Sequence, residues 1–235
     1  MSQRIWIIIF LNKEGVLFLS HSTIMQRLLD AKIIAIVRGV APEHMIPLAN
    51  ALLEGGVSCM EITYNQARAG NETITSLRVL SESFGGDICL GAGTVLTPEQ
   101  VLSAAEGGAR YIISPNTDTV VIKAVKQAGL ISMPGAMTPS EVVAAYQAGA
   151  DIVKLFPAGE LGIPYLKALR GPLNHIPLSA VGGITATNAR SFLDAGVCCV
   201  GVGGSLVNVR QIEAGNFHEI TKTARLLVQA VLGNS

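Results

Sequence analysis

Charged residues are unusually few in this sequence, at 14% of its 235 residues. The 17 basic side chains balance the 17 acidic ones, so the chain lacks the positive excess that would indicate nucleic acid or an anionic membrane as a partner. Because 49% of the residues are hydrophobic, we expect a large core and a surface that is partly covered by other subunits.

Cysteine motifs and long hydrophobic runs are also missing. The cysteines lie in apolar, strand-like surroundings without the CxxC spacing of a zinc or redox site, and they are Cys59, Cys89, Cys198 and Cys199. We interpret them as reduced core residues of a cytoplasmic protein. The N-terminal run IWIIIFL is too short to span a bilayer, and Lys13 and Glu14 interrupt it before a signal peptide could develop. Neither export nor membrane association is expected.

Residues 1–22 are predicted to form a short N-terminal extension. Two β-rich runs, Ile5–Leu11 and Val16–Leu19, flank a turn-like Asn-Lys-Glu-Gly segment, which predicts a small hairpin. The extension differs in pattern from the repeat that follows. Residues 23–235 are assigned to one domain that begins with a helix.

From residue 33 onward, short apolar runs alternate with amphipathic stretches at a regular interval. The eight runs read IIAIVRG, CMEITY, ICLGAGTV, RYIISP, LISMPGAM, DIVKLFPA, PLSAVGG and CCVGVGG. Thr-Pro at 97–98 and 138–139 supplies helix N-caps, and EGG, QAG and DAG endings place glycine just past helix C-termini. Eight such units predict an α/β fold, a single-domain (β/α)8 TIM barrel. An open doubly wound sheet is the alternative, but no GxGxxG turn followed by a helix and an acidic residue is present.

Polar residues late in the strands are the candidates for a site, because sites in such barrels lie at the C-terminal strand ends. In the second run Glu61, Thr63 and Asn65 stand two residues apart, and the pleat of a strand turns all three to one face. The apolar residues between them suit the helix layer. The pattern therefore predicts that the three polar residues line the barrel.

Lys154 is the most unusual candidate, because it stands inside the apolar run ADIVKLFPAG. Either it lies near a strand end and extends its ammonium group to water, or the chain places an amine in a pocket. A buried salt bridge with Glu61 is a further alternative, although such pairs stabilise poorly. In the functional interpretation, burial beside Phe156 favours a free amine, which attacks a ketone to form a Schiff base. Glu61 then acts as general acid and base.

Arg38, Thr94 and the glycines of the last two strands are candidates for binding an anionic substrate. Arg38 ends the first run and offers a forked donor to a carboxylate, though an arginine leaving the strand at the surface gives the same pattern. GAGT at 91–94 adds the Thr94 hydroxyl, or is only a tight turn. VGG at 181–183 and GVGGS at 201–205 end the seventh and eighth runs, where barrels bind phosphate on backbone amides.

Histidine is absent from all of these positions. The four histidines lie in the N-terminal segment, in a helix, before a strand and in the C-terminal region, and they are His21, His44, His175 and His218. Because none stands at the site end of a strand, a metal-dependent mechanism is not expected.

Several of these motifs follow one another in a characteristic order. They are Glu61 in ExT, Thr94 in GAGT, SP at 114–115, PG at 134–135, KLFPA at 154–158, GG at 182–183 and GGS at 203–205. As a set, over about residues 23–232, they resemble the class I aldolases that act on 2-keto-3-deoxy-6-phosphogluconate (KDPG) and 4-hydroxy-2-oxoglutarate (KHG).

The resemblance implies a role for each matched residue. Lys154 would be the Schiff-base lysine and Glu61 the acid and base. The substrate-binding residues implied are Arg38 and Thr94 for the pyruvyl carboxylate, Phe156 as a pocket wall, Pro115, and Gly182, Gly183, Gly204 and Ser205 for a phosphate. The reaction implied is retro-aldol cleavage of a small 2-keto acid to pyruvate and either glyceraldehyde 3-phosphate or glyoxylate. It needs no metal or organic cofactor, and the family resemblance also implies a homotrimer.

Two departures from the family pattern concern the substrate. Many relatives carry arginine two residues after the threonine of ExT and threonine before the GG of the seventh strand, where this chain has Asn65 and Val181. Asn65 leaves Arg38 as the carboxylate partner, and a similar VGG occurs in relatives that act on the galactonate epimer. A phosphosugar isomerase or epimerase, which needs no amine nucleophile, and a non-catalytic metabolite-binding barrel are the alternatives.

Overall fold

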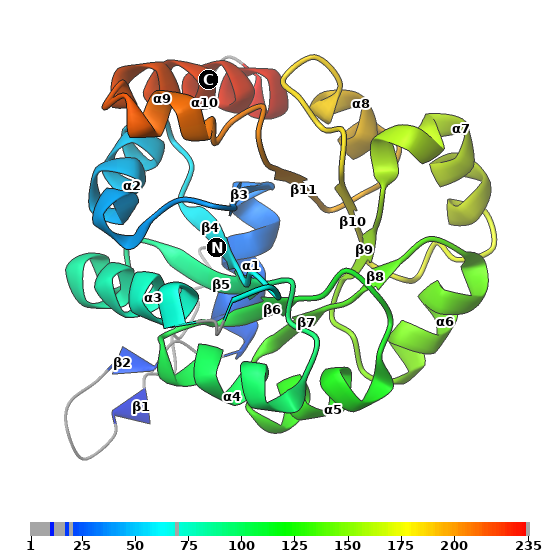
Figure 1. Cartoon of the computed structure of the whole chain (residues 1–235). Helices are drawn as coiled ribbons and strands as arrows, with labels where there is room; N and C mark the ends of the chain where they lie inside the picture. Colours follow the sequence, from blue (N-terminus) through cyan, green and yellow to red (C-terminus); the bar gives the residue numbers. More distant parts are fainter. Residues whose placement is uncertain (1–9, 12–16, 19–20, 69–70, 234–235) are drawn as a thin grey trace, which may run out of the picture.

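Strands and helices alternate along the chain in its computed structural model, which describes residues 10–11, 17–18, 21–68 and 71–233 (Figure 1). The barrel strands are β3 (Ile33–Val37), β4 (Cys59–Thr63), β5 (Cys89–Gly93), β6 (Tyr111–Ile113), β7 (Ile131–Met133), β8 (Gly135–Ala136), β9 (Val153–Leu155), β10 (Leu178–Val181) and β11 (Cys199–Val202). The helices are α1 (His21–Ala31), the 3₁₀ helix η1 (Pro42–His44), α2 (Met45–Glu54), α3 (Asn71–Phe84), α4 (Pro98–Glu106), α5 (Thr119–Gln127), α6 (Pro139–Gln147), α7 (Ala158–Arg170), α8 (Ala189–Asp194), α9 (Val209–Glu213) and α10 (Phe217–Leu232).

The barrel strands form one parallel sheet in the order β7-β6-β5-β4-β3-β11-β10-β9-β8. The two ends of this order are separated in the chain only by Pro134, so the sheet curls into a nearly closed barrel. The fifth predicted strand is split there, because proline has no N–H to donate to a ladder. The Pro134 carbonyl still accepts from the Lys154 amide at 2.8 Å and so joins this strand to β9. The predicted TIM barrel is confirmed.

The helix starts follow the predicted capping chemistry. Thr97 and Thr138 have extended backbones, and their hydroxyls accept from the amides of Gln100 and Glu141. The Glu141 carboxylate also accepts from the Thr138 amide at 2.8 Å, which completes a capping box. Past the helix ends, glycines such as Gly108 at φ 101° adopt the left-handed conformation that ends a helix.

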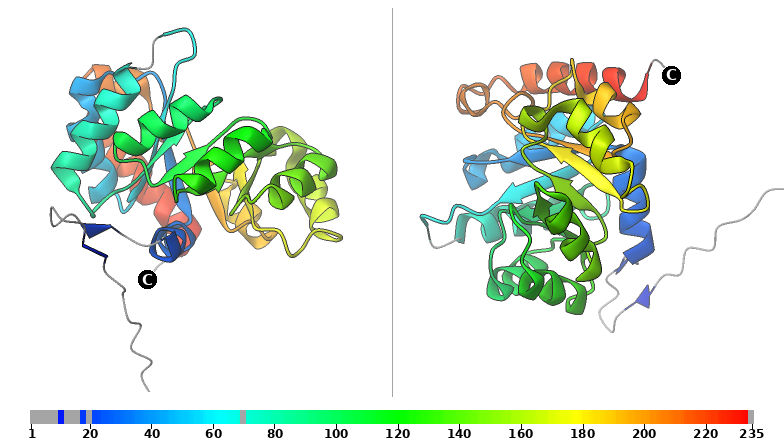
Figure 2. Two further views of the ribbon diagram at one scale, coloured as in Figure 1. Left: turned by 90° about the horizontal axis from the view of Figure 1, so that it is seen from below. Right: turned by 90° about the vertical axis from the view of Figure 1, so that its right-hand side faces the viewer.

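Two apolar clusters lie on the two sides of the sheet. The outer cluster fills the space between strands and helices. The inner cluster fills the N-terminal half of the barrel and contains Ile34, Cys59, Cys89, Tyr111, Ile113, Ile131, Met133, Ile152 and Cys199. Ile24 and Leu28 of α1 pack on it, and Figure 2 shows α1 lying across that end of the barrel. Helix α1 thus closes the N-terminal end and leaves the C-terminal end for a site. Cys59, Cys89 and Cys199 are free and buried, as predicted, whereas Cys198 is free but only partly buried.

A polar cluster fixes the start of α1 to the strands. The Asp151 carboxylate accepts from Lys126 Nζ at 2.7 Å and from the Ser132 amide at 2.8 Å. His21 Nε2, at the first residue of α1, lies 3.1 Å from the same carboxylate. Asp151 therefore joins α1, α5 and β7.

The strands β1 (Phe10–Leu11) and β2 (Leu17–Phe18) pair antiparallel and lie outside the barrel, in agreement with a hairpin (Figures 1 and 2). The other residues of the predicted hairpin lie outside the described residues. Helix α1 begins at His21, and the division of the chain after residue 22 stays a prediction. In the described part of the chain, no helix combines the length and the apolar character needed to cross a membrane.

We predict that Asp151→Asn lowers the free energy of unfolding by about 1–3 kcal/mol, because Lys126 loses its anionic partner and the new amide group faces other donors. Urea unfolding followed by circular dichroism measures the change. Asp194→Asn is the matched control, since that carboxylate pairs with Arg190 at the surface and is 59% exposed. Its loss should stay within about 0.5 kcal/mol. Equal losses would contradict the role given to Asp151.

Candidate active site

Lys154 on β9 and Glu61 on β4 both lie inside the barrel. Lys154 is only 7% exposed and Glu61 1%, so the lysine does not reach water from a strand end. The strand neighbours Val153 and Leu155 belong to the outer cluster, which confirms the predicted alternation. Among the described residues no salt bridge joins Lys154 to Glu61, and Glu61 Oε2 has no hydrogen-bond partner. The structure therefore does not support the salt-bridge alternative.

Burial changes the proton affinity of both groups. It lowers the pKa of Lys154 below its ordinary value; the Glu61 charge opposes this shift and the Arg38 charge adds to it. Burial likewise raises the pKa of Glu61, against the opposing charges of Lys154 and Arg38. The amine is thereby shifted toward the neutral nucleophile, and the carboxyl group toward a form that can hold a proton.

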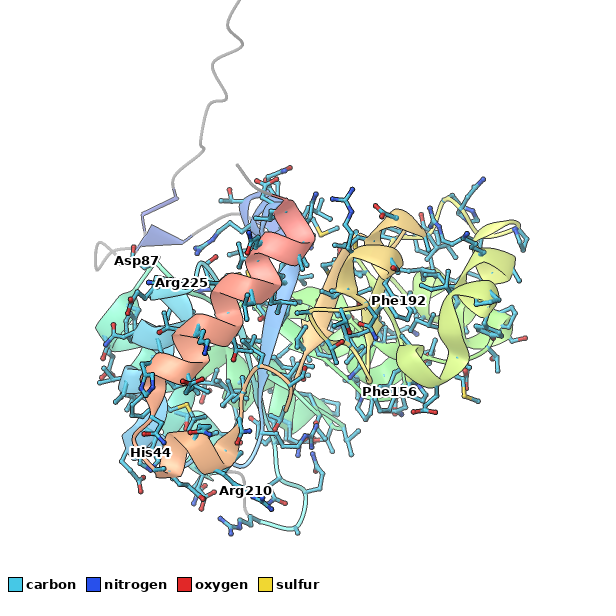
Figure 3. All side chains as sticks on the ribbon, turned by 90° about the horizontal axis from the view of Figure 1, so that it is seen from above. His44, Asp87, Phe156, Phe192, Arg210 and Arg225 are labelled. Carbon is cyan, nitrogen blue, oxygen red and sulfur yellow. The ribbon has the colours of Figure 1, made fainter. Side chains whose placement is uncertain are left out.

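Phe156 lies beside the amine, just past the end of β9. Lys154 Nζ is 4.8 Å from the centre of the ring, and Phe156 is 39% exposed. In Figure 3, Phe156 lies toward the same side of the molecule as His44 and Arg210, which follow other strands, whereas Asp87, which precedes β5, lies toward the opposite side. The ring thus stands between the amine and solvent at the C-terminal end of the barrel.

Arg38 and Thr94 meet at the same end. Arg38 Nη2 donates to Thr94 Oγ1 at 3.0 Å. Thr94 has a φ of 56°, an uncommon value for a β-branched residue and one that is typical of functional sites. Because the Arg38 charge shifts the pKa of both Lys154 and Glu61, the guanidinium group acts on the same interior. The structure therefore brings these four predicted residues together.

Gly93 makes room for Glu61. A Cβ atom on Gly93 would lie 1.7 Å from Glu61 Oε1, and one on Gly91 would lie 2.1 Å from the ring of Tyr111. Two residues of GAGT therefore have to be glycine because the Glu61 and Tyr111 side chains occupy the space beside them inside the barrel. Sequence reasoning did not identify this reason for the glycines. It also missed Tyr111, because the apolar run RYIISP makes this residue resemble ordinary core.

A cavity of about 390 Å³ opens at the ends of β10 and β11. It is lined by Ile36, Arg38, Phe156, Val181, Gly182, Gly183, Ile184, Thr185, Gly201, Gly203, Gly204 and Ser205. Among the described residues, the amides of Gly183, Gly204 and Ser205 donate no hydrogen bond within the protein, so they are available to an anion. The Ser205 hydroxyl donates to the Ile184 carbonyl at 2.8 Å and has to rotate to reach a ligand.

The profile of the family described as KDPG and KHG aldolase matches residues 24–223. The chain belongs to this aldolase family. It is similar to the 2-dehydro-3-deoxy-6-phosphogalactonate aldolase of Escherichia coli (strain K12), with 34% identity over 180 residues, 76% of this chain and 86% of that protein. The KHG/KDPG aldolase of the same organism is 35% identical over 189 residues, 80% of this chain and 86% of that protein. A solved structure, the KDPG aldolase from Legionella pneumophila with pyruvate captured as a covalent carbinolamine intermediate, has a TM-score of 0.78 at 30% identity and covers 85% of this chain and 96% of its own.

Two further predicted positions of the aldolase lie in loops. Pro115 is partly buried just past β6, and its carbonyl lies so close to Gly135 that a Cβ there would be 2.3 Å from it. Strand β4 ends at Thr63, so its alternation does not extend to Asn65, which is exposed and accepts from the Ala67 amide at 3.0 Å. The expectation that Asn65 lines the barrel is wrong.

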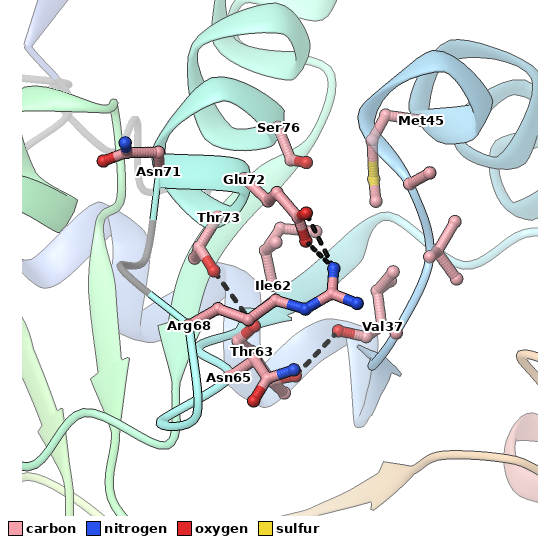
Figure 4. Close-up of a pocket in the computed structure, with 13 residues that line it drawn as sticks. Val37, Met45, Ile62, Thr63, Asn65, Arg68, Asn71, Glu72, Thr73 and Ser76 are labelled. Atoms are coloured by element: carbon pink, nitrogen blue, oxygen red, sulfur yellow. Dashed lines mark hydrogen bonds and ion pairs between the residues drawn. The ribbon is translucent and has the colours of Figure 1, made fainter.

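A second cavity of about 390 Å³ is bordered by residues of β3, β4, α2 and α3 (Figure 4). Its lining includes Ile62 and Ser76, and Arg68 forms an exposed ion pair with Glu72 at 2.7 Å. Thr63 and Asn65, two of the polar strand-end candidates, line it, whereas none of the residues to which the family resemblance gives a catalytic or substrate-binding role does. Across the described ranges, no three His, Cys, Asp or Glu side chains gather in a way that could hold a metal ion.

We predict that Gly93→Ala leaves the barrel folded but lowers the kcat of the aldolase at least about 100-fold, because the added methyl group displaces the Glu61 carboxyl group. Steady-state kinetics and circular dichroism measure the two effects. Gly86→Ala is the matched control, since its Cβ would meet no atom within 4 Å. A Gly93→Ala protein with the kcat of the wild type would contradict the placement of Glu61.

Proposed function

We propose that this aldolase uses a Schiff base to cleave KDPG, or its galactonate epimer, to pyruvate and glyceraldehyde 3-phosphate. Cleavage of 4-hydroxy-2-oxoglutarate to pyruvate and glyoxylate follows the same chemistry and belongs to the proposal. The observation that carries it is the buried Lys154 amine, which faces Phe156 and shares the barrel interior with Glu61. The names of the two E. coli relatives support the substrate class.

The first step is attack of the neutral Lys154 amine on the C2 carbonyl of the keto acid. The resulting carbinolamine loses water and becomes a protonated imine, whose positive charge can take up electrons. Burial favours the attack, because it lowers the pKa of Lys154 and so increases the share of free amine. The Legionella enzyme, captured with pyruvate as a carbinolamine, supports an intermediate of this kind.

Glu61 then accepts the proton of the C4 hydroxyl group as the C3–C4 bond breaks. The bonding electrons move through C3 and C2 onto the imine nitrogen, which leaves an enamine and releases the aldehyde. Glu61 returns a proton to C3, and water hydrolyses the imine to pyruvate and the free amine. Because burial raises the pKa of Glu61, this group suits a step in which a proton is both accepted and returned.

One extended substrate can occupy the whole site. Arg38 and Thr94 hold the C1 carboxylate, for which a forked guanidinium group is well matched. Arg38 and Phe156 also line the cavity at the ends of β10 and β11, here called the glycine cavity. A phosphate at the far end of the substrate therefore meets the amides of Gly183 and Gly204. The Pro115 position, past β6, belongs to the same strand-end face.

Val181 bears on the stereochemistry of the substrate. It lines the glycine cavity and offers two methyl groups but no hydrogen bond to a substrate hydroxyl. Kinetics with the gluconate and galactonate phosphates, their unphosphorylated forms and hydroxyoxoglutarate therefore decide which substrate the aldolase prefers.

We predict that Lys154→Met abolishes turnover and leaves a folded barrel, because methionine fills a similar volume without a nucleophile. Incubation with pyruvate and borohydride, followed by mass spectrometry of intact protein and peptides, should place an adduct on Lys154 of the wild type and none on the variant. Lys167→Met is the matched control, since this exposed lysine of α7 should be replaceable without loss. A wild type without an adduct on Lys154 would exclude the proposed mechanism in favour of an isomerase or a non-catalytic barrel.

We predict that Ser205→Ala lowers kcat/KM for a phosphorylated substrate by about 5- to 30-fold, equivalent to roughly 1–2 kcal/mol for a hydrogen bond to a charged group. Hydroxyoxoglutarate has no phosphate and should keep its rate. Ser191→Ala, on the exposed side of α8, is the control for general effects. Equal losses on both substrates would mean that the phosphate site lies elsewhere.

We also propose that the aldolase is a cytoplasmic homotrimer. Large apolar side chains are exposed on helices that pack side by side, at Leu102 of α4, Val120 of α5 and Tyr146 of α6. Exposed apolar side chains on neighbouring helices support contact with other subunits. Light scattering at the mass of a single monomer would contradict the trimer. The free cysteines support a reducing compartment.

A further inference from the structure

Three buried polar atoms inside the barrel have no hydrogen-bond partner among the described residues. They are Glu61 Oε2, Tyr111 OH and Ser179 Oγ. Tyr111 and Ser179 are fully buried, at 0% exposure, and Glu61 is 1% exposed. Buried polar groups are nearly always paired, because an unpaired one loses its bonds to water and gains nothing. Three such atoms in one barrel interior therefore point to a shared network.

The strand register relates the two hydroxyl groups to the catalytic pair, Tyr111 to Glu61 and Ser179 to Lys154. Glu61 on β4 pairs with Gly91 on β5, and Gly91 pairs in turn with Tyr111 on β6. On the opposite side of the barrel, Ser179 on β10 pairs with Lys154 on β9. All of them stand at positions whose side chains point inward, so the two hydroxyl groups belong to the same interior as the catalytic pair.

Gly91 allows the Tyr111 ring to lie inside the barrel. A Cβ at Gly91 would lie 2.1 to 2.4 Å from three ring atoms, so any larger residue would exclude the ring from its place. Burial raises the pKa of Tyr111 well above its ordinary value, with further contributions from Cys59, Cys89, Glu61 and Cys199. The phenol therefore stays protonated and remains a hydrogen-bond donor.

We propose that Tyr111 is a positioning residue for Glu61, to which its O–H donates through a short buried network that includes Ser179 and ordered water. A neutral donor directed at a carboxylate stabilises the charged form and fixes its orientation, so Glu61 is held ready to accept a proton despite its burial. The inference rests on the proposed role of Glu61 as the base.

Two cations and one neutral donor surround Glu61 in this scheme. Lys154 on β9 and Arg38, just past the end of β3, lower the pKa of Glu61 through their charges, against the larger effect of burial. Tyr111 on β6 is the neutral donor, and the cysteines that face it come from β4, β5 and β11. Removing the phenol O–H leaves both cations in place, so the resulting change reports on the network alone.

The direct test is titration of the Glu61 carboxyl group by ¹³C NMR in protein labelled at the glutamate side-chain carboxyl carbons. The Glu61 signal is assigned by its loss in Glu61→Gln. In Tyr111→Phe the midpoint of Glu61 should rise by about one pH unit, the size expected for a lost hydrogen bond to a charged group. The acidic limb of the kcat profile should move in the same direction, because Glu61 acts as the carboxylate.

Tyr64→Phe is the matched control. Tyr64 is another buried tyrosine, but it belongs to the outer cluster, where its hydroxyl donates to the Gln100 carbonyl at 3.2 Å. Loss of the Tyr64 hydroxyl should lower the free energy of unfolding and leave the titration midpoint of Glu61 unchanged. Ser179→Ala removes the second hydroxyl and should raise the midpoint by a smaller amount; it decides the question if Tyr111→Phe does not fold.

An unchanged midpoint in folded Tyr111→Phe, together with a higher melting temperature, would overturn the proposal, because the hydroxyl would then be an unpaired group that only costs stability. The NMR midpoint does not depend on turnover. Failure of the wild type to trap pyruvate would contradict the aldolase mechanism, whereas the titration would still decide the role of Tyr111.

Discussion

The burial of an amine and a carboxyl group in one barrel interior is the constraint on which the rest of the site depends. Bulk water, which would stabilise both charged forms, has little access to them, so burial lowers the pKa of Lys154 and raises that of Glu61. Their mutual attraction opposes both shifts. The result is a pair whose proton affinities are drawn toward each other, which is what a reaction that attacks as an amine and then moves a proton requires.

The barrel limits the access of bulk solvent to this pair, because the character of its interior changes along the axis. At the N-terminal end, Ile24 and Leu28 of α1 pack on apolar strand residues and close the bottom. The middle holds the buried polar side chains of Lys154, Glu61 and Ser179. At the C-terminal end Phe156 partly covers the amine, while free backbone amides past β10 and β11 face the opening. Because α1 closes the other end, the C-terminal end is the one at which the described residues leave room for a substrate.

Much of this could be predicted from local sequence, because each strand, each cap and the alternation around Lys154 depend on neighbours in the chain. Thr138 and its capping box are an example. The error at Asn65 arises because the alternation of a strand was extended two residues beyond the end of β4. The contacts of Gly93 with Glu61 and of Gly91 with Tyr111 join different strands. No pattern within one strand reports which side chain fills the space that a glycine leaves on its neighbour.

In the proposed mechanism, Arg38 connects substrate binding to the proton affinities of Lys154 and Glu61. In the free aldolase its charge lowers the pKa of both Lys154 and Glu61. In the proposed complex the substrate carboxylate beside Arg38 offsets that charge, so Glu61 becomes a stronger base once the substrate is in place. The same change acts against the free amine, because it also favours the ammonium form of Lys154. Burial, the first cause of the Lys154 shift, then has to keep the amine neutral in the complex, and the Phe156 ring beside it maintains that burial while the mouth of the barrel is occupied.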